Sequence, residues 1–310
     1  MKEVTNKTRR EYASIFLVFN MNSGKNMFND GFGRVQRMLK SLRKIYYKAT
    51  INFVCVDTFA DVRLQVSLAC QLKTELIIVA GGDGSLRVAS DVLHSSEHQA
   101  RLMVFPVGTV NLVAHELNLP VDNAQWLTRL VYGEDKLIYP MYINGELFLS
   151  VAGAGFDSYV ISKVSAEEKK QLGKAIYMVK AGSIFKSTWS KRFKISVDDQ
   201  EIDEQPASVL VMHGQYYAGT YYKIMPQARL SDEFFYVITF SRAIATDVMK
   251  HMLQVVAGEL LDDENIKVYK AKKLSISTDE ADFPVQADGD VVCTLPVNIN
   301  IAERGIWFVV

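Results

Sequence analysis

Cysteine is scarce in this sequence of 310 residues, with three residues at positions 55, 70 and 293. Their spacing matches neither a zinc site nor a disulfide framework, so we expect reduced thiols and a cytoplasmic location. No apolar run approaches the roughly 20 residues that a membrane span requires. The N-terminal segment is basic and has no apolar stretch of the kind found in signal peptides, so we expect no secretion signal.

The chain also lacks a net charge, because 35 Lys and Arg residues balance 35 Asp and Glu residues. Nucleic-acid-binding domains usually carry a basic excess, so we expect no nucleic-acid partner. Hydrophobic residues make up 49% and charged residues 23% of the chain, which is typical of a soluble globular protein. The length predicts about two domains.

Three glycines and one aspartate stand out at residues 81–85, Gly-Gly-Asp-Gly-Ser. An apolar run at 76–79 predicts a buried strand before them, and the periodicity of 86–93 predicts a helix after them. The N–H groups at such a helix start favour a phosphate. Asp83 would repel that phosphate unless Mg²⁺ lay between them or the carboxylate received hydrogen bonds. The alternative is a tight turn with a capping aspartate.

Three further apolar runs predict buried strands, and polar or glycine-rich residues follow each of them. The runs at 15–19, 51–56 and 102–105 precede Asn20, Thr58 and the segment 106–111. Helical patterns at 30–46, 60–73 and up to about 117 alternate with the strands, which predicts a doubly wound parallel sheet. Because such sheets bind ligands beyond the carboxyl ends of their strands, we predict a nucleotide-binding α/β domain at residues 1–137.

After residue 137, the pattern changes to short runs that alternate polar and apolar residues. Such runs, bounded by turn residues, predict a β-rich second domain at 138–302, either a sandwich or a barrel. Helical patterns at 165–186 and 244–258 interrupt it, and the last segment, 303–310, is expected to return to the first domain. The predicted strands lie at 148–151, 193–197, 208–212, 234–238 and 274–277.

Six motifs together resemble the catalytic domain family of diacylglycerol kinases, which includes bacterial lipid kinases and sphingosine kinases and is distantly similar to NAD kinases. The resemblance implies an NAD kinase-like α/β domain followed by a C-terminal β-sandwich. The motifs occur in the family's order, at residues 20–24, 81–85, 106–111, 153–157, 226–232 and 286–290.

The resemblance implies an ATP-dependent lipid kinase that uses Mg²⁺ and phosphorylates a hydroxyl of a diacylglycerol-like or sphingoid lipid in the interdomain cleft. It assigns the general base to Asp290 and a water-mediated Mg²⁺ contact to Asp83. It assigns a lipid head-group contact to Asp157, for which a turn or cap residue is the alternative. A second metal, Mg²⁺ or Ca²⁺, would use Asp232 with the carbonyls of Arg229 and Phe234. The alternative is that this site binds no metal. The nucleotide would contact Asn20, Thr58, Gly81, Gly82, Asp83, Gly84, Ser85, Gly108, Thr109 and Asn111.

Several positions depart from the family's pattern, so a non-catalytic nucleotide- or lipid-binding member is the alternative, and an NAD kinase is a weaker one. Ser85 keeps the hydroxyl of the family's threonine, whereas Asp290 is one methylene shorter than the family's glutamate. The sequence names neither the acceptor lipid nor the oligomeric state, for which a homodimer is one option. The other departures are Arg87, Val88, Leu112 and Glu233.

Residues 163–192 combine eight basic residues with apolar ones and only two acidic ones, Glu167 and Glu168. A basic amphipathic segment can lie on anionic lipid, so we expect the protein to associate peripherally with a membrane surface. The alternative is a solvated helix packed on the second domain.

Overall fold

The computed structural model describes most of the chain, and the described residues form two compact units. Unit 1 comprises Met1–Ile138 and Arg304–Val310, and unit 2 comprises Tyr139–Glu303. The predicted helix at 165–186 lies outside the described residues, as does nearly all of the basic segment, and the predicted helix at 244–258 is described only in part. The described residues are 8–24, 30–163 and 191–310, except 218, 220, 221, 243–246, 248, 249, 252, 253, 255, 256 and 281.

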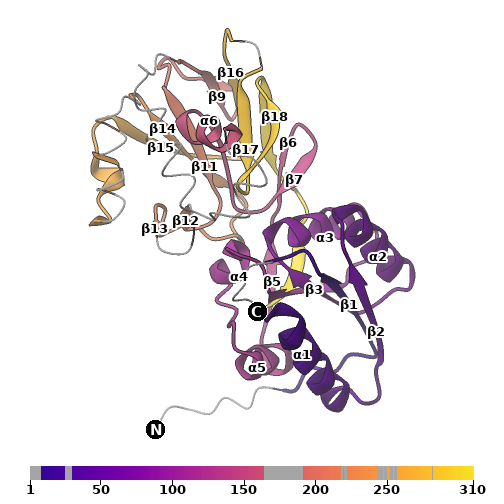
Figure 1. Ribbon diagram of the computed structural model, residues 1–310. Helices are drawn as coiled ribbons and strands as arrows, with labels where there is room; N and C mark the ends of the chain where they lie inside the picture. Colours follow the sequence, from indigo (N-terminus) through magenta and orange to yellow (C-terminus); the bar gives the residue numbers. More distant parts are fainter. Residues whose placement is uncertain are drawn as a thin grey trace. The chain divides into compact units, whose positions relative to one another are not determined.

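Unit 1 contains a six-stranded sheet in the order β2-β1-β3-β4-β20-β5 (Figure 1). Neighbouring strands pair in parallel except β5, which runs antiparallel to β20. Every residue of β3 is buried, as expected for a parallel strand that is covered on both faces. The strands are β1 (Ser14–Asn20), β2 (Thr50–Val56), β3 (Leu76–Gly81), β4 (Arg101–Pro106), β5 (Asp135–Ile138) and β20 (Ile306–Val309).

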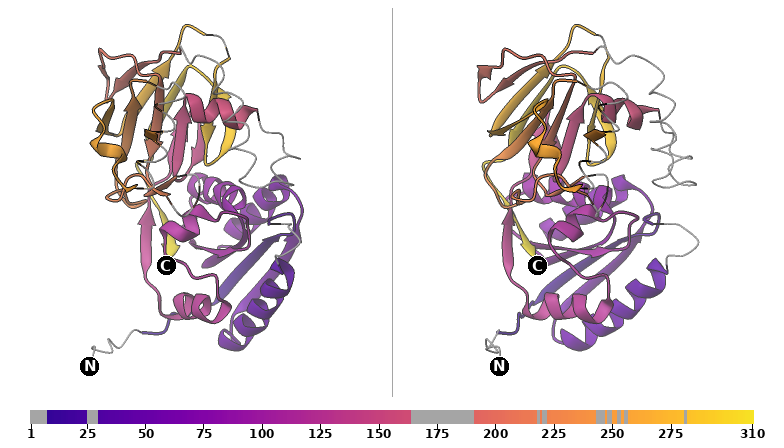
Figure 2. Two further views of the ribbon diagram at one scale, coloured as in Figure 1. Left: turned by 60° about the vertical axis from the view of Figure 1, so that its left-hand side comes forward. Right: turned by 90° about the vertical axis from the view of Figure 1, so that its left-hand side faces the viewer.

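Short polar side chains set the starts of three helices in unit 1. Asp30 and Asp122 accept hydrogen bonds from the backbone N–H groups of Gly33 and Gln125, and Thr58 forms a capping box with Asp61. The helices lie on both faces of the sheet, and α1 contacts α5 whereas α2 contacts α3 (Figures 1 and 2). They are α1 (Gly31–Ile45), α2 (Phe59–Gln71), α3 (Asp83–Ser95), α4 (Leu112–Glu116) and α5 (Asn123–Tyr132).

The strand order reverses direction between β1 and β3. The chain passes from β1 to β2 on one side and then returns to β3 on the other side of β1. The loops that follow β1 and β3 therefore flank the reversal, which is where doubly wound sheets bind ligands. In unit 1, the residues at this reversal are Asn20, which ends β1, and Gly82, which follows β3.

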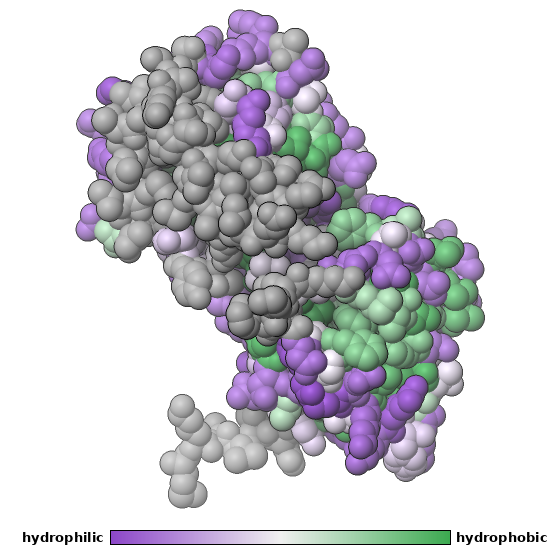
Figure 3. Space-filling view, viewed as in Figure 1, coloured by the Kyte–Doolittle hydropathy of each residue, from purple (hydrophilic) through white to green (hydrophobic). Residues whose placement is uncertain are grey.

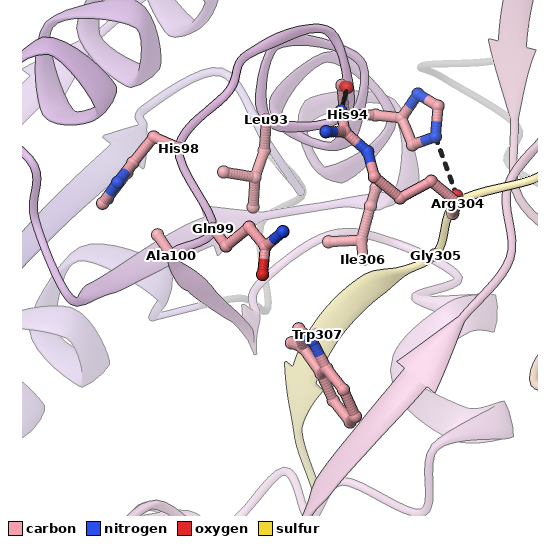
Figure 4. Close-up of a pocket in the computed structure, with 9 residues that line it drawn as sticks. All are labelled: Leu93, His94, His98, Gln99, Ala100, Arg304, Gly305, Ile306 and Trp307. Carbon is pink, nitrogen blue, oxygen red and sulfur yellow. Dashed lines mark hydrogen bonds between the residues drawn. The ribbon is translucent and has the colours of Figure 1, made fainter.

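The C-terminal strand β20 completes the sheet of unit 1, and the end of α3 holds its start. His94 Nε2 lies 2.8 Å from the carbonyl oxygen of Arg304, and the Arg304 guanidinium donates to the carbonyls of His94 and Ser96 (Figure 4). A cavity of about 20 Å³ beside these hydrogen bonds has room for about one water. It is lined by residues before β4 and at the start of β20, so it lies at the edge of the sheet opposite the carboxyl ends.

Helix α2 carries apolar residues on two sides. Leu64 and Leu68 of the helix and Leu72, the residue directly after it, follow one another at intervals of four residues and are 63%, 40% and 56% exposed. Figure 3 shows apolar surface over this part of unit 1. The buried side of α2 consists of smaller residues, Val62, Val66, Ala69 and Cys70. None of the described helices is long and apolar enough to cross a bilayer.

Unit 2 is a β-sandwich of two six-stranded antiparallel sheets, in the orders β10-β9-β16-β19-β6-β7 and β15-β14-β11-β8-β17-β18 (Figure 2). It also contains α6 (Phe156–Ser162), a 3₁₀ turn (Leu260–Asp262) and a separate hairpin of β12 (Tyr216–Tyr217) and β13 (Tyr222–Lys223). The fold-class prediction is confirmed, with a sandwich rather than a barrel. The sheet strands are β6 (Met141–Ile143), β7 (Glu146–Phe148), β8 (Val151–Ala154), β9 (Lys194–Val197), β10 (Gln200–Glu201), β11 (Ser208–Met212), β14 (Phe235–Phe240), β15 (Ile266–Ala271), β16 (Lys273–Ser277), β17 (Pro284–Ala287), β18 (Asp290–Thr294) and β19 (Val297–Ile301).

Alternate residues of the second sheet serve two different cores. Val209 and Val211 of β11 join a core that lies between the two sheets and that also contains Ile276 and Val297 of the first sheet. Leu210 and Met212 point to the other face and pack in a second core. The period of two in 208–212 therefore reflects two buried faces, which explains why all five residues are buried.

One predicted strand, at 148–151, is wrong in its bounds. The segment divides at Leu149 and Ser150 into β7 and β8, which belong to different sheets. The Asp288 carboxylate accepts hydrogen bonds from the N–H groups of Leu149, Ser150 and Val151, at 2.9, 2.9 and 3.2 Å. Because these N–H groups are bonded to a side chain, they are not used in a strand ladder.

Asp263 is expected to make the stability of unit 2 sensitive to acid. Its buried side chain forms an ion pair with Lys250 Nζ at 2.7 Å and accepts a hydrogen bond from the Asn265 N–H at 2.9 Å, and these contacts hold its pKa well below the usual range. An aspartate with a depressed folded-state pKa stabilises the fold above its unfolded-state pKa of about 4 and loses this effect as the pH falls towards the folded-state value.

The measurement is urea unfolding of the wild type and of Asp263→Asn between pH 7 and pH 3. We expect the wild type to be more stable at pH 7 and the difference to shrink below about pH 4. Asp279→Asn is the control, because Asp279 also pairs with a lysine but is 88% exposed. A difference that stays constant down to pH 3 would contradict the assignment.

Candidate active site

The loop after β1 and the start of α3 are joined by hydrogen bonds between side chains. The buried Asn20 donates from Nδ2 to Ser85 Oγ at 3.0 Å, and its Oδ1 accepts from the N–H of Asn22 at 3.0 Å. Ser23 Oγ lies 3.4 Å from Ser85 Oγ and accepts from the Gly82 N–H at 3.4 Å. Asn20 and Ser85, both predicted to bind nucleotide, thus also hold the two loops in one arrangement.

The N-terminus of α3 meets the requirements of a phosphate site. Its cap residue is Gly82, which supplies no side-chain hydrogen bond. The first N–H groups of an α-helix have no partner within the helix, and together with the helix dipole they favour an anion. A β-carbon at Gly84 would lie 2.9 Å from the ring of Phe59, so the turn packs directly under this half-exposed ring.

Asp83 directs its charge away from this helix start and onto the next helix. Its two carboxylate oxygens accept hydrogen bonds from the N–H groups of Leu112 and Val113, at 3.0 and 3.1 Å. These N–H groups belong to the first turn of α4. Of the two ways in which an aspartate can sit beside a phosphate site, the hydrogen-bonded one is therefore present in unit 1.

The two glycine turns touch each other through their backbones. A β-carbon at Gly108 would lie 2.4 Å from the Cα of Gly82 and 2.6 Å from Asn111 Oδ1. Asn111 adopts the left-handed conformation (φ 53°), accepts from the Gly108 N–H at 2.9 Å and donates to the Gly108 carbonyl at 2.8 Å. The side chain of Asn111 therefore closes the loop after β4 on itself, and Gly108 of this closed loop contacts Gly82 of the loop after β3.

This contact predicts a large effect of Gly108→Ala. The new methyl group would meet the backbone of Gly82, which cannot rotate away as a side chain can, so we expect a loss of about 1–3 kcal/mol in the free energy of unfolding. We also expect weaker ATP binding, because the two turns would move apart. The checks are urea unfolding and calorimetric titration with ATP. Gly82→Ala is the milder comparison, since its β-carbon would lie 3.3 Å from the Gly108 Cα, and equal effects of the two variants would contradict the proposed contact.

Two further predicted nucleotide contacts lie beside these turns. The Thr58 hydroxyl donates to Asp61 Oδ2 at 2.7 Å and accepts from the Asp61 N–H at 3.1 Å, so it caps α2. Asn22 Nδ2 donates to the carbonyl of Asp57 at 2.6 Å, which brings the loop after β2 to the loop after β1. Thr109 is exposed. For Thr58 and Thr109, a nucleotide contact stays a prediction.

The described residues fit Mg²⁺ through water better than through a protein cage. No group of three or more His, Cys, Asp or Glu side chains among them could hold a metal ion. Each carboxylate oxygen of Asp83 accepts one hydrogen bond from α4. Mg²⁺ commonly keeps several waters and takes its other ligands from substrate phosphates. A water-mediated Mg²⁺ contact of Asp83 is compatible with this geometry and stays a prediction.

In unit 2, Asp290 is the first residue of β18, directly after a two-residue hairpin turn. The turn residues Asp288 and Gly289 both have positive φ, 48° and 85°, and Ala287 pairs with Asp290 across the hairpin. An Asp-Gly pair with positive φ at both positions is typical of type I′ hairpin turns. Asp290 therefore lies just outside the hairpin turn.

The predicted second metal site is a loop whose hydrogen bonds close on themselves. Asp232 Oδ2 accepts from the Arg229 N–H and the Asp232 N–H donates to the Arg229 carbonyl, each at 2.9 Å. The Asp232 carbonyl accepts from Nε2 of His213, whose pKa burial lowers, so that the ring is neutral. The Arg229 guanidinium donates to the carbonyls of Pro226 and Ala228, so a cation is already present at this loop. A metal bound by Arg229, Asp232 and Phe234 stays a prediction.

Asp157 lies in the first turn of α6 and receives two side-chain hydrogen bonds. Tyr217 Oη and Gln286 Nε2 both donate to Asp157 Oδ2 at 3.2 Å. Burial raises the pKa of Asp157, and hydrogen bonds from Ser158, Tyr217 and Gln286 oppose that shift. Burial also raises the pKa of Tyr217 well above its ordinary value, so the phenol stays protonated and remains a donor.

Sequence reasoning missed several residues that complete these sites. Ser23 lies within the quoted 20–24 motif, and Gln286 opens the 286–290 motif, so the motifs themselves were an available signal for both. Phe59 and Tyr217 contact the sites from segments without any motif, and no local pattern marks them. Leu112, one of the departures from the family, takes part through its backbone N–H, which does not depend on its side chain.

Comparisons with known proteins agree with these observations. Residues 14–141 match the family model of the diacylglycerol kinase catalytic domain, and residues 150–307 match the YegS C-terminal NAD kinase beta sandwich-like domain. A diacylglycerol kinase of Staphylococcus carnosus is 26% identical over 93% of this chain and 92% of its own length, and one of Staphylococcus epidermidis is 25% identical over 94% and 90%.

The fold also agrees with a solved structure. A diacylglycerol kinase from Bacillus anthracis superimposes with a TM-score of 0.77 at 22% identity, covering 97% of this chain and 98% of that one. At this identity, the likeness shows the fold alone. The two family models together cover the glycine turns of unit 1 and the Asp157, Asp232 and Asp290 segments of unit 2. The chain therefore belongs to the diacylglycerol kinase family.

Proposed function

We propose that this protein is a lipid kinase that transfers the γ-phosphoryl group of ATP to a hydroxyl of a diacylglycerol-like lipid. The observation that carries the proposal is the pair of touching glycine turns in unit 1, where the start of α3 is free of a side-chain cap and Asp83 is bound to α4. Relatives that cover more than 90% of the chain are named diacylglycerol kinases, which supports the choice of lipid.

In the proposed reaction, the N–H groups at the start of α3 bind ATP phosphates, and Asn20 and Ser85 keep the loops around them in place. The acceptor oxygen forms a bond to the γ-phosphorus while the bond from that phosphorus to the β–γ bridging oxygen breaks. The Asp290 carboxylate takes the proton of the acceptor hydroxyl, and ADP leaves. Mg²⁺ on the ATP phosphates would neutralise the charge that develops on them.

The test is phosphoryl transfer from labelled ATP with Mg²⁺ to a panel of acceptors in mixed micelles: a diacylglycerol, a sphingoid base and NAD. We expect label in the phosphorylated diacylglycerol. Label in the sphingoid product would change the substrate class, and label in NADP would support the NAD kinase alternative. Binding of ATP or lipid without any transfer would identify a non-catalytic member of the family.

A membrane partner and a homodimer remain proposals as well. A diacylglycerol resides in a bilayer, so a kinase that acts on it has to visit the membrane surface. Five of the eight basic residues proposed for that contact, at 163–192, lie outside the described residues, and Lys163, Lys191 and Arg192 are described. The prediction that nucleotide and lipid meet in a cleft between the domains also stays a prediction.

A further inference from the structure

The turn before Asp290 is held from two sides. On one side, the Asp288 carboxylate accepts from the three N–H groups of residues 149–151, and the Asp288 N–H donates to the Val151 carbonyl at 2.8 Å. On the other side, the Gly289 N–H donates to Gln286 Oε1 at 3.1 Å. The Gly289 N–H belongs to the peptide between Asp288 and Gly289, so this second bond restrains the backbone one peptide before the proposed base.

Gln286 is 1% exposed, and both the oxygen and the nitrogen of its carboxamide form hydrogen bonds. Its oxygen accepts from Gly289, and its Nε2 donates to Asp157 Oδ2 at 3.2 Å. A carboxamide that rotated by half a turn would place its NH₂ group against the Gly289 N–H and its oxygen against the Asp157 carboxylate. Asp157 therefore determines which way Gln286 faces, and with it whether the Gln286 oxygen meets the Gly289 N–H.

Asp157 is itself fixed in place. A β-carbon at Gly153 would lie 2.6 Å from Asp157 Oδ2, so the carboxylate rests on the backbone of β8. Tyr217 donates to the same oxygen from β12. The residues of this chain of hydrogen bonds come from α6, β12 and β17, which Figure 1 labels. At both of these hydrogen bonds, Asp157 serves as an acceptor, a role that does not require its negative charge.

We propose that Asp157 and Gln286 are positioning residues for Asp290: Asp157 orients the Gln286 carboxamide, and Gln286 holds Gly289 and thereby the Asp290 backbone. This inference rests on the proposed function, because it assigns Asp290 the role of base. It gives Asp157 a role through Gln286 in place of a direct lipid contact. Displacement of a catalytic group by about 1 Å can cost roughly 10²-fold in rate, so small shifts of this turn matter.

The experiment compares kcat and KM for the lipid in four variants. Gln286→Met keeps the length of the side chain without its hydrogen bonds, and we expect kcat to fall about 10- to 100-fold with little change in KM. Asp157→Leu should have a similar effect. Asp157→Asn should stay near wild type, because the asparagine oxygen still accepts from Gln286 and Tyr217. Gln200→Met, at an exposed glutamine of β10, is the matched control and should change nothing.

The same substitutions in an Asp290→Asn background separate positioning from a general loss of structure. If Gln286 acts through Asp290, Gln286→Met should have no further effect on kcat once the base has been removed. An equal further loss in that background would overturn the inference. If Gln286→Met fails to fold, as judged by circular dichroism, Tyr217→Phe, Asp157→Leu and Asp157→Asn are compared in the two backgrounds instead. Tyr217→Phe should lower kcat with KM unchanged.

Three further outcomes distinguish the positioning role from a direct lipid contact and from a wrong assignment of the base. A rise in KM for Asp157→Asn at constant kcat would show a direct lipid contact and overturn the positioning role. Full activity of Gln286→Met together with loss of activity in Asp290→Asn would refute the inference alone. Full activity of Asp290→Asn would instead refute the assignment of the base in the proposed function.

Discussion

Asp290→Asn is expected to lower kcat for the lipid by roughly 10²–10⁴-fold while leaving the fold intact. An asparagine at this position cannot accept the proton of the acceptor hydroxyl. The residue begins β18 just after the hairpin turn, so its replacement leaves the bonds of Asp288 and Gln286 in place. The measurement is phosphoryl transfer at saturating ATP and diacylglycerol, with circular dichroism as the check of folding.

The reach of this side chain provides a second, sharper comparison. Aspartate is one methylene shorter than the glutamate that the family carries here, and a general base has to come within hydrogen-bond reach of its proton, directly or through one water. Asp290→Glu should therefore retain or raise kcat if reach limits the reaction. Asp203→Asn, at an exposed aspartate of the same unit, is the control and should have no effect. Wild-type turnover in Asp290→Asn on a confirmed lipid substrate would show that Asp290 is not the base.

Asp83→Asn is expected to have the second large effect, a loss of kinase activity of roughly 10²-fold or more. The amide would present its NH₂ group to either Leu112 or Val113, so one of the two bonds to α4 would be replaced by a contact between two donors. The negative charge that can hold a water-bound Mg²⁺ would also be gone. We expect the Mg²⁺ concentration for half-maximal activity to rise in any residual activity.

Asp122→Asn is a matched control for this experiment. Asp122 also binds an N–H group at a helix start in unit 1, accepting from Gln125 at 2.9 Å, and asparagine caps helices about as well as aspartate. It should leave both Tm and activity unchanged. If Asp83→Asn lowered Tm but left turnover and Mg²⁺ dependence unaltered, Asp83 would be a helix cap without a role in catalysis.

Much of the fold could be predicted because its signals are local. The apolar run 76–79 and the helical period of 86–93 lie next to the glycines between them, so strand, turn and helix can be recognised in one short window. The strands of unit 2 at 193–197 and 208–212 were recognised from their period of two. Unit 1's last strand, β20, was also expected, because an isolated apolar run at 306–310 follows the β-rich segment.

The wrong strand at 148–151 shows where local reasoning fails. The short run Phe-Leu-Ser-Val resembles a strand, yet the carboxylate of Asp288, 138 and 139 residues away, accepts the N–H groups of Ser150 and Leu149. A hydrogen-bond partner so distant in sequence leaves no trace in the pattern of the segment. The strand bounds were therefore decided by tertiary structure, whereas the β-rich class of the domain was not.

The sequence by itself determined the two-domain class and the residue types available for chemistry: glycine turns for phosphates, one carboxylate among them, and a further carboxylate after the Gln286 motif. The tertiary structure alone decided what each carboxylate binds. Asp83 meets N–H groups 29 and 30 residues later, and Asp157 meets Tyr217 and Gln286, 60 and 129 residues later. The physical reason is that a carboxylate partly removed from water requires hydrogen-bond donors. Which donors reach it depends on how distant strands and helices pack, not on the residues beside it.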